Sequence, residues 1–198
     1  MGLEIEYIDG QTPFDEDEKE DLLIKSITTH GELDEFEQLN IEKAVEWSLG
    51  KKIKPENIIS EDFIKDLHYR MFNDVWKWAG EFRRTNKNIG VDKNSIGISL
   101  KQLIDDCKYW IENKVYSDEE IVIRFKHKIV NIHCFSNGNG RHSRLIADIM
   151  INQVFGKPFF TWSQSNLNKT GEARSKYLKA IRAGDNGDLQ PLIQFAKS

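Results

Sequence analysis

A polar loop containing two glycines lies between two apolar-periodic stretches of the chain. The stretches are IVIRFKHKIVNIH at 121–133 and RLIADIMINQVF at 144–155, and both have the spacing of an amphipathic helix. The loop therefore joins the C-terminal end of one predicted helix to the start of the next, where backbone N–H groups lack intrahelical partners. Such a chain is expected to be mainly helical, with an anion site at that helix start.

The loop residues favour a phosphate ligand. Gly138 and Gly140 can adopt backbone angles closed to other residues, so that successive N–H groups point into one concavity. Arg141 and Arg144 lie three residues apart and share the adjoining helix face. The generic phosphate motifs do not apply, because no Lys-Ser/Thr follows the glycines and Ser143 stands where a dinucleotide fingerprint needs Gly or Ala. The sequence thus predicts a local phosphate site of another kind.

His133 comes directly before this loop, where an imidazole could accept a proton from a hydroxyl. A lone histidine here would more simply cap the preceding helix, but the neighbouring arginines favour the role of a base. Asn139 could bind a phosphate oxygen or hold the turn of the loop. The remaining histidines lack such neighbours and are predicted to be structural or solvated: His30, His68, His127 and His142.

Composition restricts the partners. The 28 basic and 32 acidic residues give a net charge of −4, so no broad attraction to nucleic acid or to an anionic membrane is expected. Cys107 and Cys134 are too few for a disulfide framework. The sequence contains no HExxH motif and no closely spaced pair of cysteines, so it does not indicate a zinc site. The sequence shows no signal peptide and no apolar stretch of membrane-spanning length. A cytoplasmic protein is expected.

Hydrophobic periodicity predicts an N-terminal arm at 1–31 and a single helical domain at 32–198, with its core motif at 133–144. Thr29 and Glu32 form a candidate capping box for a helix at 32–49. The apolar stripe of that helix is expected to be Leu33, Phe36, Leu39, Ala44, Val45 and Trp47. The other predicted helices are 60–76, 100–114, 118–132, 141–155, 172–183 and a short one from Pro191, and 82–98 is predicted as a loop or a β-hairpin.

The loop, read as HCFSNGNGRHSR, resembles the signature of the Fic/Doc family, HPFx(D/E)GN(G/K)RxxR. WKWAGEFR at 76–83 and KYLKAIRAGDNGDLQPLIQF at 176–195 are similar to other segments of that family. Nearly the whole chain is similar to its branch called mobile mystery protein B. Seven fixed positions of the signature match: His133, Phe135, Gly138, Asn139, Gly140, Arg141 and Arg144.

The resemblance implies a Fic-fold helical bundle with one β-hairpin flap, and transfer of AMP from ATP to a Ser, Thr or Tyr hydroxyl of a protein. It also implies a helix-turn-helix partner and carriage on mobile elements or in a toxin–antitoxin setting. The flap around Ile89, Gly90 and Val91 would align the protein substrate by strand addition. The implied roles are a base at His133, a backbone cradle at Gly138, Asn139 and Gly140, a phosphate ligand at Arg141, a γ-phosphate ligand at Arg144 and a loop anchor at Phe135.

Two positions depart from the signature. Cys134 replaces its proline, and Asn137 stands where the family's Asp or Glu holds Mg²⁺. A neutral amide oxygen lacks the Coulombic attraction of a carboxylate for Mg²⁺. The sequence therefore leaves several alternatives open: adenylyl transfer with weaker metal use, a Doc-like phosphotransfer, transfer of another nucleotide, or a non-catalytic nucleotide-binding or partner module.

Many Fic proteins are inhibited by a helix carrying (S/T)xxxE(G/N), whose glutamate pairs with the last motif arginine. Thr28 and Glu32 supply TxxxE, although Leu33 follows where Gly or Asn is expected. Glu32 is thus predicted either to inhibit or only to complete the capping box. Glu35 and Glu37 are the alternates one turn along.

Overall fold

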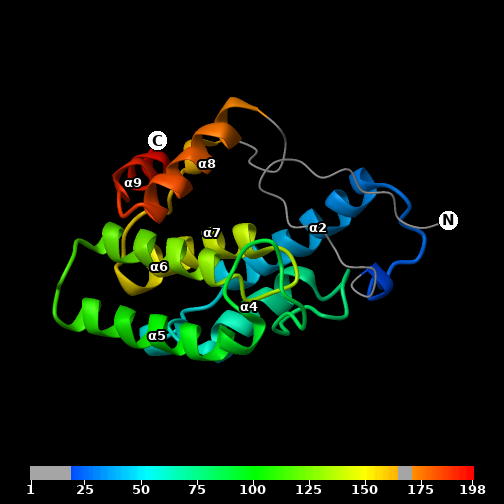
Figure 1. The fold of residues 1–198 in the computed structure, drawn as a ribbon, viewed down its shortest axis with the longest axis horizontal. Coiled ribbons are helices and arrows are strands. Elements are labelled where there is room, and N and C mark those ends of the chain that lie inside the picture. Colours follow the sequence, from blue (N-terminus) through cyan, green and yellow to red (C-terminus); the bar gives the residue numbers. More distant parts are fainter. Residues whose placement is uncertain (1–18, 165–170) are drawn as a thin grey trace.

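The computed structural model describes residues 19–164 and 171–198, and this part of the chain is built from α-helices, as predicted (Figure 1). Residues 1–18 of the predicted arm lie outside the described ranges. Within those ranges, no helix has both the length and the apolar character that crossing a bilayer requires. The helices are α2 (His30–Leu49), α3 (Pro55–Ile58), α4 (Glu61–Phe72), α5 (Ile96–Glu112), α6 (Asp118–Ile132), α7 (Asn139–Ile149), α8 (Glu172–Asp185) and α9 (Gln190–Lys197).

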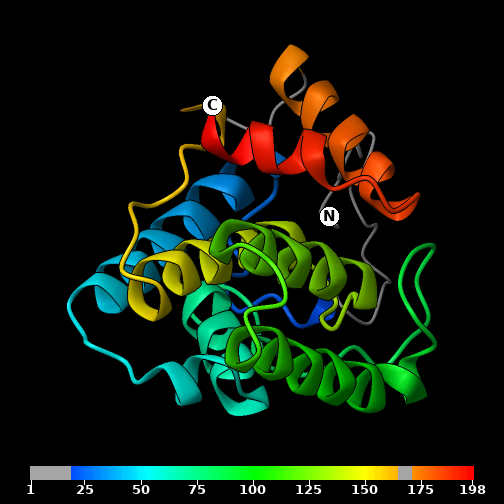
Figure 2. The ribbon, with the colours of Figure 1, turned by 90° about the vertical axis from the view of Figure 1, so that its left-hand side faces the viewer.

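Three short helical turns supplement these helices: η1 (Lys93–Ser95), η2 (Met150–Val154) and η3 (Trp162–Gln164). The π-helical turn η2 continues α7, so the predicted helix at 141–155 is present with a change of pitch after Ile149. Helices α6 and α7 lie side by side in the middle of the molecule, with α5 against α6, and α8 and α9 packed together (Figures 1 and 2). Their shared core is apolar and fully buried, with Val122, Phe125 and Ile146 at its centre.

Helix α2 begins at the predicted capping box but buries a different face. The Thr29 hydroxyl accepts a hydrogen bond from the backbone N–H of Glu32, whose carboxylate accepts one from the backbone N–H of Thr29. The predicted stripe is wrong at Phe36 and Leu39, which are 40% and 57% exposed. The prediction is confirmed at Leu33 and Ala44, which are buried. The other buried side chains on this face follow the helical period and are polar: Glu37, Asn40 and Ser48.

The predicted helix at 60–76 ends early, at Phe72. Beyond it, the Asn40 side chain accepts a hydrogen bond from the backbone N–H of Asp74, and Trp76 forms an isolated antiparallel bridge with Leu22. The hydrogen bond from Asp74 to Asn40 of α2 therefore involves backbone that the sequence pattern had assigned to the helix at 60–76.

The predicted β-hairpin flap is wrong, and the alternative prediction of a loop at 82–98 holds up to η1, with α5 beginning at Ile96. In the described residues 82–98, a hairpin ladder is replaced by one isolated antiparallel bridge, which joins Phe82 to Phe135 of the site loop. Side chains join the two arms of the loop instead: Asn86 accepts a hydrogen bond from the backbone N–H of Lys93 at 2.8 Å and donates one to Asp92 at 2.9 Å. Such side-chain bonds compete with a strand ladder for the same backbone groups.

Candidate active site

His133 follows the last residue of α6 and has a left-handed backbone conformation, with φ of 58°. His133 is only 4% exposed to solvent. Burial, reinforced by the positive charge of Arg83, lowers the pKa of His133 from its ordinary 6.5 to about 4. The imidazole is therefore neutral at pH 7, which is the form that a general base needs.

Arg83 connects His133 to the flap loop. Its Nε donates to the carbonyl of His133 at 2.7 Å, and its other nitrogens donate to the carbonyls of Thr85 and Val91. The backbone N–H of Val91 in turn donates to the carbonyl of Ile132 at 3.3 Å. The sequence analysis did not single out Arg83, although it ends the WKWAGEFR segment.

Gly90 brings the flap into direct contact with His133. Its φ is +100°, and a Cβ at this position would lie 2.7 Å from the Cβ of His133. Only glycine fits so close an approach at that backbone angle. The neighbouring Ile89 is 47% exposed. The three predicted flap residues are thus placed beside the predicted base, on a loop that is not a hairpin.

Phe135 and Asn139 hold the loop from within. Asn139 donates to the carbonyl of Phe135 at 2.8 Å and accepts from its backbone N–H at 3.0 Å. Of the two roles considered for the Asn139 side chain, the structure therefore shows the one that holds the loop. Phe135 is fully buried, and its ring stacks on that of His68 with centroids 3.7 Å apart.

His68 is a structural residue of the loop. The backbone N–H of Gly80 donates to its Nδ1 at 3.0 Å, so Nε2 carries the proton and donates to the carbonyl of Asn137 at 3.1 Å. Burial holds the pKa of His68 well below its ordinary value, so the ring stays neutral, and the two hydrogen bonds select its tautomer. His142 is likewise buried, with Nε2 3.0 Å from the carbonyl of Ile64. These placements agree with the structural role predicted for both.

Gly138 begins α7 with φ of +74°, and a Cβ there would lie 2.4 Å from the ring of Phe72. No side chain of the described residues caps this helix start, so its first-turn N–H groups can bind an anion. The N–H of Gly138 itself is used locally, because it donates to Oδ1 of Asn137 at 2.6 Å. Of the three backbone N–H groups predicted to bind phosphate, those of Asn139 and Gly140 therefore remain for this role.

The two motif arginines have different surroundings. Nη1 of Arg141 donates to the Glu37 carboxylate at 2.6 Å, and the same carboxylate accepts from Nε1 of Trp76 at 2.6 Å. The Glu37 side chain is 3% exposed. Arg144 is half-buried, with its Cζ 5.5 Å from the centroid of the Tyr177 ring.

Glu32, the inhibitory candidate, bonds to neighbouring threonines and, among the described residues, to no arginine. It is exposed, and its carboxylate accepts hydrogen bonds from Thr28 and Thr29, which lower its pKa. The glutamate that contacts a motif arginine is Glu37, one of the two alternates. Its position could have been recognised, because residue 37 lies one turn after Leu33 on the face that also carries Ala44.

The predicted magnesium position provides a poor set of donors. The Oδ1 of Asn137 is neutral and accepts the N–H of Gly138. Across 19–164 and 171–198, no group of three or more His, Cys, Asp or Glu residues is arranged to hold a metal ion. Mg²⁺ is usually held by one or two carboxylates together with phosphates. The residues at this position do not fit a carboxylate-held magnesium ion.

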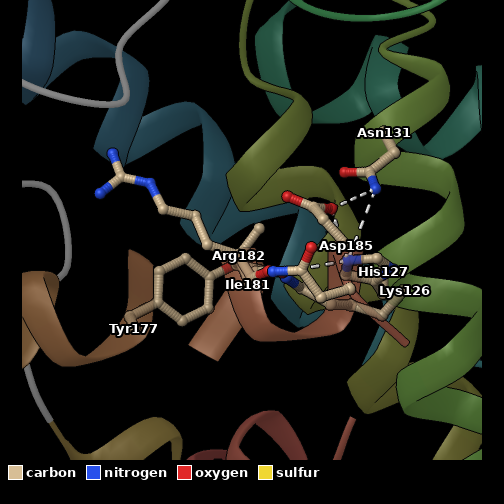
Figure 3. Close-up of polar contacts among 8 residues, drawn as sticks. Lys126, His127, Asn131, Tyr177, Ile181, Arg182 and Asp185 are labelled. Carbon is tan, nitrogen blue, oxygen red and sulfur yellow. Dashed lines mark hydrogen bonds and ion pairs between the residues drawn. The ribbon is translucent and has the colours of Figure 1, made fainter. Parts of the chain in front are cut away.

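A cavity of about 490 Å³ opens between α5, α6 and the turn after α8. It reaches the flap at Val91 and the end of α6 at Ile132, and His127 and Asp185 also line it. His127 Nε2 lies 3.0 Å from Asp185 Oδ1, which also accepts a hydrogen bond from Asn131 at 2.7 Å (Figure 3). These contacts join α8 to α6 close to the candidate base.

The fold and site together define a helical domain in which a neutral histidine adjoins an anion-binding helix start. Residues 58–151 match the model of the Fic/DOC family. The part of the chain that carries the flap and the site loop is therefore similar to this family.

Curated relatives of the chain have Fic in their names. The chain is 25% identical over 175 residues to "Protein adenylyltransferase Fic" of Aedes aegypti, and 27% identical over 176 residues to the protein of that name in Drosophila willistoni. These matches cover 86% of this chain but 32% of each relative. The chain thus spans about a third of the length of the curated relatives it matches.

Solved structures share the fold. The N-terminal FIC domain of the Bep8 protein of Bartonella sp. 1-1C matches with a TM-score of 0.69 at 16% identity, covering 90% of both chains. The BepC protein of Bartonella tribocorum, solved with bound AMPPNP, matches with a TM-score of 0.69 at 18% identity, covering 88% of this chain and 89% of that one. At these identities the likeness establishes the fold alone.

Proposed function

We propose that this chain is a protein adenylyltransferase that moves AMP from ATP to a Ser, Thr or Tyr hydroxyl of a target protein. The observation that carries the proposal is the position of His133: a buried, neutral imidazole held against the flap and one loop away from the anion-binding start of α7. The names of the curated relatives and the AMPPNP bound to BepC support the same reaction class.

In the proposed reaction, His133 accepts the proton of the target hydroxyl while the hydroxyl oxygen attacks the α-phosphorus of ATP. The new P–O bond forms as the bond to the pyrophosphate breaks, and pyrophosphate leaves with its electron pair. The N–H groups of Asn139 and Gly140 stabilise the charge on the α-phosphate, and Arg144 binds the departing phosphates. The flap residues Ile89 to Val91 position the target segment. The helix-turn-helix partner that the family resemblance implied stays a prediction.

The experiment is incubation with ATP labelled at the α-phosphate or at the γ-phosphate, together with cell lysate as a source of targets. Adenylyl transfer labels a protein from α-labelled ATP only, and His133→Ala abolishes the label. His142→Gln is a matched control, because it removes a second buried histidine without touching the proposed base. Label from the γ-phosphate would instead establish the Doc-like phosphotransfer, and equal labelling by wild type and His133→Ala would exclude His133 as the base.

Asn137 is the reason to keep a non-catalytic nucleotide-binding module as the second candidate. Asn137→Asp restores the carboxylate that the family signature has at this position, and we expect it to increase Mg²⁺-dependent labelling about tenfold. An inactive wild type that Asn137→Asp activates would establish the binding module. A wild type that is already active and gains nothing would show that the amide suffices.

We further propose that Glu37, rather than Glu32, restrains the site. A phosphate that binds Arg141 must displace the Glu37 carboxylate from a bond of 2.6 Å. Because Glu37 also accepts the Trp76 indole N–H, the restraint is part of the packing between α2 and the turn after α4. The contact is with the first motif arginine, whereas the family resemblance implied the last.

A further inference from the structure

Lys126 of α6 is a buried ammonium without a carboxylate bonded to it. The residue is 0% exposed, and its Nζ donates to the hydroxyl of Tyr177 on α8 at 2.6 Å (Figure 3). The salt bridges found among the described residues do not include it. Burying a charged group is costly unless it is paired or bonded. Because an apolar side chain would fill this position without that cost, the bond between Lys126 and Tyr177 suggests a role other than packing.

The same tyrosine faces Arg144. The Arg144 guanidinium carbon lies 5.5 Å from the centroid of the Tyr177 ring, and Lys126 Nζ lies 4.6 Å from it. Tyr177 is 6% exposed and thus sits between two cations contributed by α6 and α7. Its electron-rich ring and its oxygen attract both.

Electrostatics agree with this arrangement. Burial raises the pKa of Tyr177, but the charges of Lys126 and Arg144 more than offset it, so that the pKa is lowered overall. Burial lowers the pKa of Lys126, and Tyr177 raises it in part. The three side chains are coupled, and each one's position depends on the other two.

We propose that Lys126 and Tyr177 are positioning residues that hold the Arg144 guanidinium at the donor side of the loop. The Lys126–hydroxyl bond fixes the position of the Tyr177 ring, and a ring fixed in this way holds the arginine, so that a ring without this bond no longer positions it. Helix α8 then belongs to the phosphate-binding machinery although none of its residues lies in the 133–144 motif. The assignment of the terminal phosphates to Arg144 rests on the proposed function.

The test uses a pair of variants that separates positioning from folding. Tyr177→Phe alone leaves a buried ammonium unpaired and is expected to lower stability. The double variant Lys126→Met with Tyr177→Phe removes the charge and the hydroxyl together, and such apolar replacements of buried polar pairs are often neutral in stability. Lys179→Met removes an exposed lysine of α8 and is the matched control.

Binding of ATP and of AMP is measured by calorimetry for each folded variant, with Arg144→Ala as the reference for complete loss. We expect the double variant to bind ATP about tenfold more weakly and AMP within twofold of wild type, because AMP lacks the terminal phosphates. Wild-type ATP affinity in a double variant with a wild-type melting temperature would overturn the proposal. An equal loss for ATP and AMP would also overturn it, since that indicates general damage to the site.

A second readout does not depend on nucleotide binding. The ¹⁵N chemical shift of Arg144 Nε, assigned with Arg144→Lys, is expected to move in Tyr177→Phe and in Lys126→Met but not in Lys179→Met. Should wild type bind no ATP, the proposed function fails while this readout still decides the positioning. An unchanged Arg144 signal in both variants would overturn the positioning itself.

Discussion

The two ends of the 133–144 loop are held in different ways. At the acceptor end, the contacts are made to the backbone and the Cβ of His133: its carbonyl accepts from Nε of the Arg83 side chain, and Gly90 packs close to its Cβ. At the donor end, side chains from other helices hold the arginines: Glu37 of α2 binds Arg141, and Tyr177 of α8 faces Arg144. The base is therefore preorganised, whereas a ligand can compete for the arginines by exchanging their partners.

The largest expected effect comes from Gly138, which joins the two ends. Gly138→Ala would place a methyl group against the ring of Phe72 at a backbone angle that alanine avoids. We expect a loss of about 3 kcal/mol in the free energy of unfolding, from strain and overpacking together. Urea unfolding measures it. Gly140→Ala is the matched control, because its nearest such neighbour is 4.0 Å away, and an equal loss in both variants would contradict the steric account.

Arg83→Lys tests the acceptor end alone. A lysine cannot bind the carbonyls of His133, Thr85 and Val91 together, so the base and the flap would lose their fixed relation. We expect labelling of the target to fall about a hundredfold, because small displacements of reacting groups are that costly, with ATP affinity within twofold of wild type. Arg84→Lys, an exposed neighbour paired with Glu81, serves as control. A parallel loss of ATP affinity would show that the two ends are not independent.

Glu37→Gln tests the donor end. The amide is expected to keep a hydrogen bond to Trp76 while losing the charge that competes with phosphate for Arg141. Calorimetry should show ATP affinity raised about fivefold, a gain of roughly 1 kcal/mol, which is of the size that charged hydrogen bonds contribute. Glu32→Gln changes a carboxylate on the same helix that bonds only Thr28 and Thr29 among the described residues. If Glu32→Gln raised the affinity and Glu37→Gln did not, the restraint would be assigned to the wrong glutamate.

The last effect is a pH dependence of stability, which is measured as a slope. Burial lowers the pKa values of His133 and His142 to about 4, below the ordinary 6.5. Between these values the unfolded chain binds more protons at these sites, so their contribution is complete above pH 6.5 and is lost as pH falls towards 4. Asp148, near Arg144, acts in the opposite sense, because burial raises its pKa from 3.8 to about 7. Its contribution is lost progressively as pH rises from 3.8 to about 7.

Asp148→Asn should therefore steepen the decline of stability between pH 6.5 and 4.5 by about 1.4 kcal/mol per pH unit. Urea unfolding at several pH values measures the slope, and Asp105→Asn, an exposed carboxylate on α5, is the control. An unchanged slope in Asp148→Asn would mean that this carboxyl is ionised in the folded protein at pH 5.

Much of the helical architecture could be predicted because local signals determine it. The capping box at Thr29 and the apolar spacing of α6 act within one or two helical turns, and the structure confirms both. The prediction was wrong where a distant contact intervened. Asn40 ends α4 early, and the flap is closed by Arg83 and Asn86 rather than by a strand ladder. On α2, three of the five buried side chains are polar, namely Glu37, Asn40 and Ser48, so hydrophobicity alone did not identify the buried face.

The sequence by itself determined the loop that carries His133, Arg141 and Arg144, since a match at seven positions within a twelve-residue stretch needs no tertiary information. Only the tertiary structure decided the state of those residues. Glu37 reaches Arg141 across 104 residues of chain, and Arg83 reaches His133 across 50. The neutrality of His133 likewise comes from burial beneath the flap. Charge state and pairing depend on which side chains come together in space, and spacing along the chain does not specify that.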